Sequence, residues 1–265
     1  METLNALTQY YGNFDEDSRL CSRRGLVEYR TTMRYIDKYL RPGMRVLEIG
    51  AATGRYSHAL ARRGFTVDAV ELVEHNIEIF KANTTPGEKV TIKQGNAKNL
   101  SGFEDNTYDI TLLLGPMYHL FTEEEKVQAL SEAIRVTKKG GIVFAAYCMG
   151  DASILMYGFV RGEIHNIIET CMLDPVTFKT FSKPWDLFEL HRKEDIDALR
   201  ERFSVTQLHF LATDGYANHM RKTLDEMDEE TFELFLRYHF ATCERQDLVG
   251  YSNHTLDIFR KEEGI

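Results

Sequence analysis

The sequence predicts an α/β protein built on a mostly parallel sheet with helices on both of its faces. Two observations support this fold class. Between residues 45 and 148, short apolar segments alternate with stretches of helical spacing, a pattern typical of parallel strands joined by helical crossovers. The first apolar segment runs directly into a turn of small residues and then into a helix, over residues 46–56. With 265 residues, the chain suffices for one large domain with a sizeable core.

Five strands and three helices account for this alternation. Each strand is a short apolar run, and each helix has apolar residues three and four positions apart. Thr122 and Glu125 have the spacing of a capping box, so the third helix is expected to begin just after Thr122. The strands are expected near residues 45–50, 65–71, 90–94, 108–114 and 142–148, and the helices near 54–63, 74–83 and 123–137.

The flanking segments add helices and two further strands. An amphipathic helix is expected over residues 26–40, and residues 1–40 are predicted to form an N-terminal helical cap. Beyond Met149, apolar residues repeat at helical spacing, which predicts a helical insertion or lid at residues 149–200 within a single domain of residues 1–265. The remaining elements are strands near 205–210 and 255–259, with a helical stretch between them near 217–243.

The turn after the first strand has the features of a nucleoside-binding site. Positions 50 to 54 carry no bulky side chains, and the following helix presents backbone N–H groups to a ligand. Glu71 ends the second apolar run, about 20 residues further on, at the spacing expected for a carboxylate that accepts from ribose hydroxyls. A dinucleotide fingerprint would require glycines at 50, 52 and 55, and Arg55 fits that pattern poorly.

The pattern Glu48-x-Gly50-x-Ala52-x-Gly54 instead resembles the first motif of class I S-adenosylmethionine-dependent methyltransferases, E/D-x-G-x-G-x-G. Alanine replaces the middle glycine and is tolerated there if its φ is negative. The resemblance implies a Rossmann-like, seven-stranded, doubly wound sheet of order 3-2-1-4-5-7-6, whose last two strands form an antiparallel pair. It continues through Gly95-Asn96-Ala97, the strand and loop at 108–120, and the helix and glycine pair at 133–141.

The resemblance also implies which residues bind S-adenosylmethionine, whose product is S-adenosylhomocysteine. Glu48 and the small turn would face the methionine part, Glu71 the ribose, and Asn96 the adenine edge, since an amide offers both donors and an acceptor. Leu72 would pack on the adenine ring. The full set of expected cofactor residues is Glu48, Gly50, Ala51, Ala52, Thr53, Gly54, Glu71, Leu72, Asn96, Ala97, Leu114 and Gly115.

Methyl transfer from a sulfonium needs mainly alignment and a dry site. A base is required only if the acceptor carries a proton, and the candidates are Tyr118 and His119, after the fourth strand. The alternatives are that His119 is a hydrogen-bonded residue covering the cofactor and that Tyr118 only packs. An acceptor pocket is expected from Tyr11, Arg19, Tyr157, Arg161 and Trp185.

Composition favours a cytoplasmic enzyme with a small organic acceptor. The formal net charge of -9 makes nucleic acid an unlikely partner. Gly115 also lacks the side-chain oxygen that the Asn/Asp-Pro-Pro-Tyr loop of amino-group methyltransferases provides.

No membrane association is expected, because no apolar run approaches ~20 residues and the N-terminus does not resemble a signal peptide. No metal site is expected from the dispersed cysteines and histidines. An RNA or protein methyltransferase and a non-catalytic cofactor-binding regulator stay open as alternatives, as does the oligomeric state.

Overall fold

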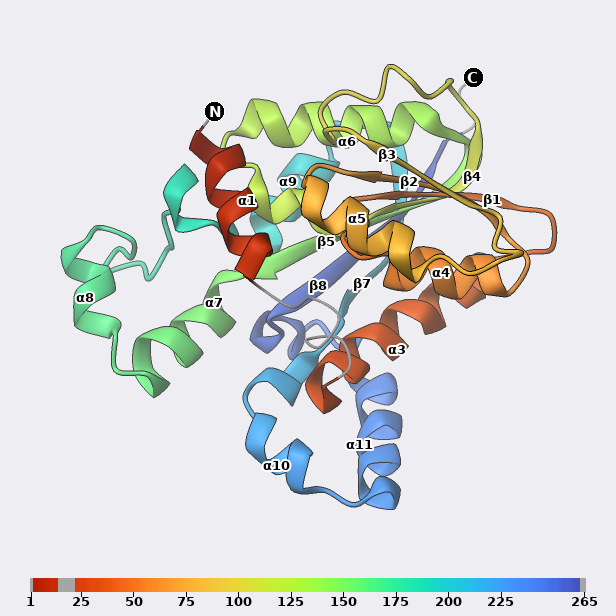
Figure 1. Cartoon of the computed structure of the whole chain (residues 1–265). Helices are drawn as coiled ribbons and strands as arrows, with labels where there is room; N and C mark the ends of the chain where they lie inside the picture. Colours follow the sequence, from red (N-terminus) through yellow and green to blue (C-terminus); the bar gives the residue numbers. More distant parts are fainter. Residues whose placement is uncertain (1, 14–21, 263–265) are drawn as a thin grey trace.

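The computed structural model describes residues 2–13 and 22–262 and contains an eight-stranded sheet. Seven strands follow the order β3-β2-β1-β4-β5-β8-β7, and the short β6 (Leu190–His191) pairs with the end of β5 (Figure 1). The long strands are β1 (Arg45–Ile49), β2 (Thr66–Glu71), β3 (Val90–Gln94), β4 (Tyr108–Leu113), β5 (Thr137–Met149), β7 (Val205–Ala212) and β8 (His254–Lys261).

The predicted strand order is confirmed. β1 is parallel to β2 and β4, and β8 is antiparallel to both β5 and β7. The additional strand β6 escaped prediction because two residues are too few to show a periodicity. Parallel pairing brings the carboxyl ends of β1, β2 and β4 to one edge of the sheet, where open α/β sheets bind their ligands.

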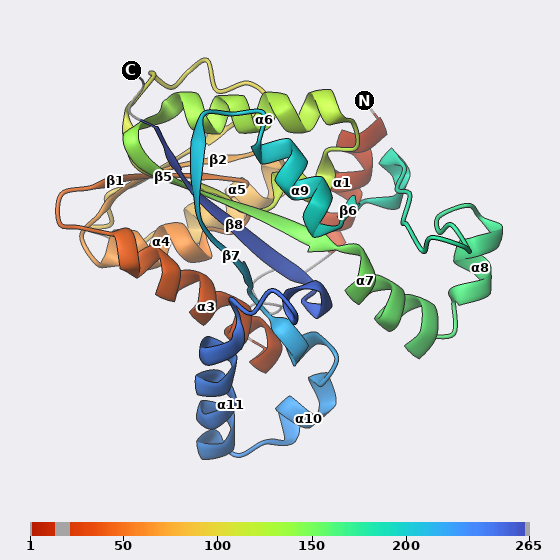
Figure 2. The ribbon, with the colours of Figure 1, turned by 180° about the vertical axis from the view of Figure 1, so that it is seen from behind.

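Helices cover both faces of the sheet (Figures 1 and 2). On one side lie α6 (Glu123–Val136) and α9 (Lys193–Arg200), and on the other α3 (Arg23–Tyr39) and α4 (Arg55–Arg62). The predicted capping box at the start of α6 is present, since Thr122 and Glu125 bond to each other's backbone N–H groups. Helix α5 (Glu74–Asn83) packs on β2 and β3, and α1 (Glu2–Asn13) packs on α5.

Two groups of helices project from the sheet (Figures 1 and 2). One follows β5 and consists of α7 (Gly150–Ser153), the π-helix η2 (Ile154–Val160) and α8 (Ile164–Glu169). The other contains α10 (Arg221–Glu226) and α11 (Glu229–Thr242), which share a small apolar cluster with α3. The single helical stretch expected near 217–243 is divided, because Met227 is extended and the Asp228 side chain caps a new helix.

Short 3-10 helices complete the described chain: η1 (Pro116–His119), η3 (Pro184–Asp186), η4 (Gly215–Asn218) and η5 (Val249–Tyr251). The core is continuous across the sheet, and its strands β1 and β4 are almost wholly buried. Within residues 2–13 and 22–262, every helix is too short or too polar to cross a membrane.

Candidate functional site

A cavity of about 340 Å³ lies beyond the carboxyl ends of the parallel strands. Its wall contains the turn after β1, the end of β2, the loop after β3 and the loop after β4. Helices α1 and α3 and the start of β8 add Leu7, Tyr11, Glu28, Thr32 and His254. Of the residues expected to bind the cofactor, all but Gly54 line this one cavity. The structure therefore brings together positions that are spread over residues 48–115.

The turn after β1 depends on two glycines. Gly50 has a φ of +79°, and a Cβ atom there would lie 2.6 Å from the Cδ atom of Pro116. Gly54 has a φ of +93°, and a Cβ atom there would lie 2.5 Å from the Phe80 ring. Both positions require glycine for conformation and space. Gly50 lets Pro116 of the loop after β4 pack directly on the turn, whereas Gly54 allows α4 to begin against Phe80.

Ala52 departs from the expectation drawn from the sequence. A negative φ was the condition for an alanine at this position, but its φ is +46°. The left-handed conformation costs an L-residue with a Cβ atom roughly 1–2 kcal/mol. The backbone of the turn thus keeps a glycine-like conformation despite the substitution, and the N–H group of Ala52 donates to Oε2 of Glu71 over 2.9 Å.

The Glu71 carboxylate ties three segments together at the cavity wall. Besides Ala52, its Oε1 atom accepts from the Val73 N–H at 2.9 Å and from Nδ2 of Asn76 at 3.3 Å. Glu71 is 6% exposed, and burial raises its pKa while these hydrogen bonds oppose the rise. The side chain holds the turn in shape and still borders the cavity.

Glu48 is a second buried carboxyl group of the same wall. It is 2% exposed and accepts a hydrogen bond from the Ser57 hydroxyl. Burial raises the pKa of Glu48 to about 8, although the bond to Ser57 lowers it in part. A nearby positive charge would favour the ionised form of such a group. This end of the cavity is therefore suited to a cationic ligand.

Asn96 begins the loop after β3, and its side chain partly stabilises the loop itself. Its Oδ1 atom accepts from the Lys98 N–H at 3.0 Å. At the preceding Gly95, a Cβ atom would lie 2.9 Å from Cγ1 of Val70, which lets the loop pack closely on β2. Asn96, Ala97 and Leu72 all line the cavity.

His119 is held by both of its ring nitrogens. Nδ1 lies 2.7 Å from the Leu187 carbonyl oxygen, which can only accept, so Nδ1 carries the proton. Nε2 lies 2.9 Å from the Tyr11 hydroxyl. Burial lowers the pKa of His119 to about 4, so the ring is neutral. Its Nε2 atom therefore accepts a hydrogen bond from the Tyr11 hydroxyl. This pair connects α1 to η1 across the cavity.

Only some of the residues predicted for catalysis or for the acceptor pocket line the cavity. Tyr11, Tyr118 and His119 line the cavity, and the Tyr118 hydroxyl lies 3.6 Å from where a Cβ atom of Gly115 would stand. Tyr157 and Trp185 are 44% and 67% exposed, and with Arg161 they stand outside the cavity wall. Arg19 lies outside the described residues.

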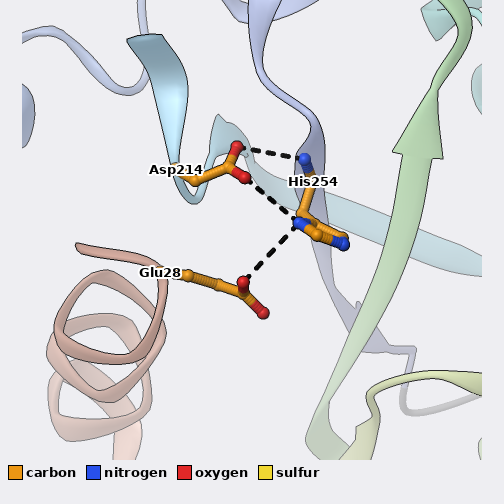
Figure 3. A group of neighbouring side chains, drawn as sticks. All are labelled: Glu28, Asp214 and His254. Carbon is orange, nitrogen blue, oxygen red and sulfur yellow. Dashed lines mark hydrogen bonds and ion pairs between the residues drawn. The ribbon is translucent and has the colours of Figure 1, made fainter. Parts of the chain in front are cut away.

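Three charged residues of the site were not identified from the sequence: Glu28, Asp214 and His254 (Figure 3). Glu28 and His254 line the cavity. Nδ1 of His254 lies 3.1 Å from Oδ2 of Asp214 and 3.6 Å from Oε2 of Glu28. Burial opposes ionisation of both His254 and Asp214. Against it, the two carboxylates raise the pKa of His254 well above its ordinary value, and the hydrogen bonds from His254 and Ser252 lower the pKa of Asp214 to about 2. No local motif links these residues, because they come from α3, the segment after β7 and the first residue of β8.

Comparisons with known proteins agree with this geometry. A family model described as a methyltransferase domain matches residues 46–141. The ubiquinone biosynthesis O-methyltransferase of Pseudomonas fluorescens (strain SBW25) is 24% identical over 189 residues, which cover 69% of this chain and 79% of that protein. A solved SAM-dependent methyltransferase of Thermotoga maritima, described as a possible histamine N-methyltransferase, has a TM-score of 0.60 at 18% identity and covers 98% of this chain and 100% of that one. A second, from Methanosarcina mazei, has a TM-score of 0.57 at 18% identity, with coverage of 87% and 98%.

Proposed function

Because the chain belongs to the class I S-adenosylmethionine-dependent methyltransferases, we propose that it methylates a small organic acceptor held inside the cavity beside the cofactor. The observation that carries this proposal is that one cavity is lined by two chemically different sets of residues. The first set is the turn after β1 with Glu48 and Glu71, and the second is Tyr11, Tyr118 and His254. We assign the first set to the cofactor end of the cavity and the second set to the acceptor end.

The first end fits the cofactor. S-adenosylmethionine supplies a methyl group already activated on a positively charged sulfur. We assign Glu48 to the positively charged methionine part, since its raised pKa leaves it ready to be ionised by a cation. Gly50 of the same turn also lines the cavity. Glu71 borders the ribose position, and Leu72, Asn96 and Ala97 border the adenine position.

The second end fits an acceptor. In our proposal the Tyr11 and Tyr118 hydroxyls orient the acceptor, while His119 positions Tyr11. A pKa of about 4 and a bond at each ring nitrogen make His119 better suited to this positioning role than to removing a proton. The name of the 24% identical relative, an O-methyltransferase, supports an acceptor that offers an oxygen atom.

The covering of the cavity supports a small acceptor. We propose that residues 1–40 act as a cap, because α1 and α3 place Leu7, Tyr11, Glu28 and Thr32 in the wall. The cavity volume lies within the size range of small-molecule sites. Residues 149–200 are proposed to form a lid, although their exposed aromatic residues stand outside the cavity wall in this structure.

Two measurements test the proposal. Calorimetric titration with S-adenosylhomocysteine establishes whether the cofactor end binds, and an assay of S-adenosylhomocysteine release is then run with pooled metabolites, with RNA and with protein extracts. We expect binding, and turnover only with a metabolite pool. Turnover confined to RNA or protein would refute the small acceptor, and binding without turnover on any pool would favour a regulatory protein.

A further inference from the structure

We propose that Glu28, Asp214 and His254 form a binding site for a divalent transition-metal ion in the acceptor half of the cavity. Binding of the ion stands on these three side chains alone. Its use in holding the acceptor rests on the proposed function. Figure 3 shows Glu28 reaching from α3 toward the His254 ring, and Asp214 approaching the same ring nitrogen from the segment after β7.

The distances among the three ligand atoms suit one ion. Protein oxygen and nitrogen ligands lie about 2.1 Å from ions such as Zn²⁺. Two such ligands are about 3.0 Å apart at a right angle and about 3.4 Å apart at a tetrahedral angle. The distances from Nδ1 of His254 are 3.1 Å to Asp214 and 3.6 Å to Glu28. All three ligand atoms lie within 4.8 Å of one another.

Asp214 is oriented by neighbours in the manner of a metal-binding carboxylate. Its Oδ1 atom accepts from the Ser252 hydroxyl at 2.6 Å, from the Asn253 N–H at 2.9 Å and from the His254 N–H at 3.1 Å. Its Oδ2 atom is the one that faces the His254 ring. Hydrogen bonds to the second oxygen of a ligating carboxylate fix its direction and tune the affinity for the metal.

His254 is oriented in a similar way. Its backbone is fixed by pairing with Cys148 at the start of β8 and by the hydrogen bond from its N–H to Oδ1 of Asp214. A metal ion would replace the proton that Nδ1 shares with Asp214. The geometry therefore needs no rearrangement of the backbone.

The residue types indicate the kind of ion and ligand. One imidazole with two carboxylates suits first-row ions such as Mn²⁺, Fe²⁺ and Zn²⁺. Three protein ligands leave a coordination position open. Since Glu28 and His254 line the cavity, an oxygen-bearing acceptor there would complete the coordination.

The test uses the full chain, freed of metal with a chelator and titrated with Mn²⁺ alone. Free Mn²⁺ is followed by its electron paramagnetic resonance signal, and Zn²⁺ binding is measured by competition. We expect one ion per chain. Glu28→Gln should weaken Mn²⁺ binding by at least about tenfold, and His254→Asn should do so independently, in case either variant folds poorly.

The matched control is Glu189→Gln. The Glu189 side chain is 16% exposed against 14% for Glu28, but it pairs with Lys126 and does not line the cavity. This control should bind Mn²⁺ as the wild type does. The site would be refuted if wild type, Glu28→Gln and His254→Asn bound Mn²⁺ equally. It would also be refuted if the wild type bound neither Mn²⁺ nor Zn²⁺ saturably, and the three residues would then be an ion-paired cluster only.

Calorimetry with S-adenosylhomocysteine in the same samples separates the two proposals. Cofactor binding without Mn²⁺ or Zn²⁺ binding would refute the metal site and leave the proposed function intact. Mn²⁺ binding without cofactor binding would refute the proposed function alone.

Discussion

The Tyr11 hydroxyl lies 2.9 Å from Nε2 of His119, which joins the N-terminal helix to the loop after β4. Because a buried imidazole nitrogen loses a partner when this hydroxyl is removed, Tyr11→Phe should lower the free energy of unfolding by about 1–2 kcal/mol. Chemical denaturation measures the change.

A double-mutant cycle with His119→Ala separates the energy of the Tyr11–His119 hydrogen bond from the other effects of each substitution on stability. The two substitutions should couple by at least about 0.5 kcal/mol, since the residues are in direct contact. Additive effects would show that the bond contributes nothing measurable.

Glu71→Gln should weaken S-adenosylhomocysteine binding by about 1–3 kcal/mol, because the carboxylate both borders the cavity and holds the Ala52 N–H. Calorimetry provides the measurement. Glu74→Gln, at the exposed start of α5, is the control and should bind normally. Unchanged affinity in a folded Glu71→Gln protein would contradict the proposed role of Glu71.

Affinity for S-adenosylmethionine should rise with pH. The pKa of Glu48 is raised to about 8, so binding of a cation below pH 8 must release its proton. Affinity is therefore expected to increase by up to about tenfold per pH unit between pH 6 and 8, and then to level off. In Glu48→Gln this dependence should disappear. A pH profile shared by wild type and variant would assign the dependence to another group.

Glu48 should also make the free energy of unfolding depend on pH, in the direction opposite to cofactor affinity. Since its folded pKa exceeds the unfolded one, Glu48 favours the fold most below about pH 4.5, and this contribution is lost as pH rises through about 8. Denaturation of the ligand-free protein at pH 5 and pH 9 should show the loss, which Glu48→Gln should diminish. An equal loss in the variant would exclude Glu48 as its source.

Ala52→Gly should be tolerated. Relief of the left-handed strain at Ala52, roughly 1–2 kcal/mol, offsets the greater flexibility of glycine in the unfolded chain, roughly 0.5–1 kcal/mol. The neighbouring Ala51 is buried and has no positive φ, so Ala51→Gly should only destabilise. Denaturation midpoints compare the two variants, and a less stable Ala52→Gly would contradict the strain.

Features that rest on local sequence were predicted well. Periodicity located the long strands, and the capping box fixed the start of α6. Glu71 lines the cavity, while its contact with a ribose stays a prediction. A turn's dihedral angles depend on more than residue type, so the positive φ of Ala52 was missed.

Contacts between side chains of distant segments were beyond prediction, although the strand order itself was predicted. Glu28, Asp214 and His254 meet only because β8 lies beside β5 and β7 and α3 packs near their ends. Nothing near His254 in the sequence identifies its partners. Similarly, exposed aromatic residues such as Trp185 cannot be told from pocket residues until the fold is known.

The register of β8 on β5 determines which β8 side chains face the cavity. His254 pairs with Cys148 and Leu256 with Ala146, so alternate side chains of β8 face the cavity. Asp257 points the other way and forms a buried ion pair with Arg200 at 3.0 Å. A slip by one residue would exchange the two faces, turning His254 away and separating Asp257 from Arg200. The Asp257–Arg200 ion pair therefore favours the register that directs His254 into the cavity. A chain that folded with β8 shifted by one residue would keep the sheet but lose the arrangement of the site residues.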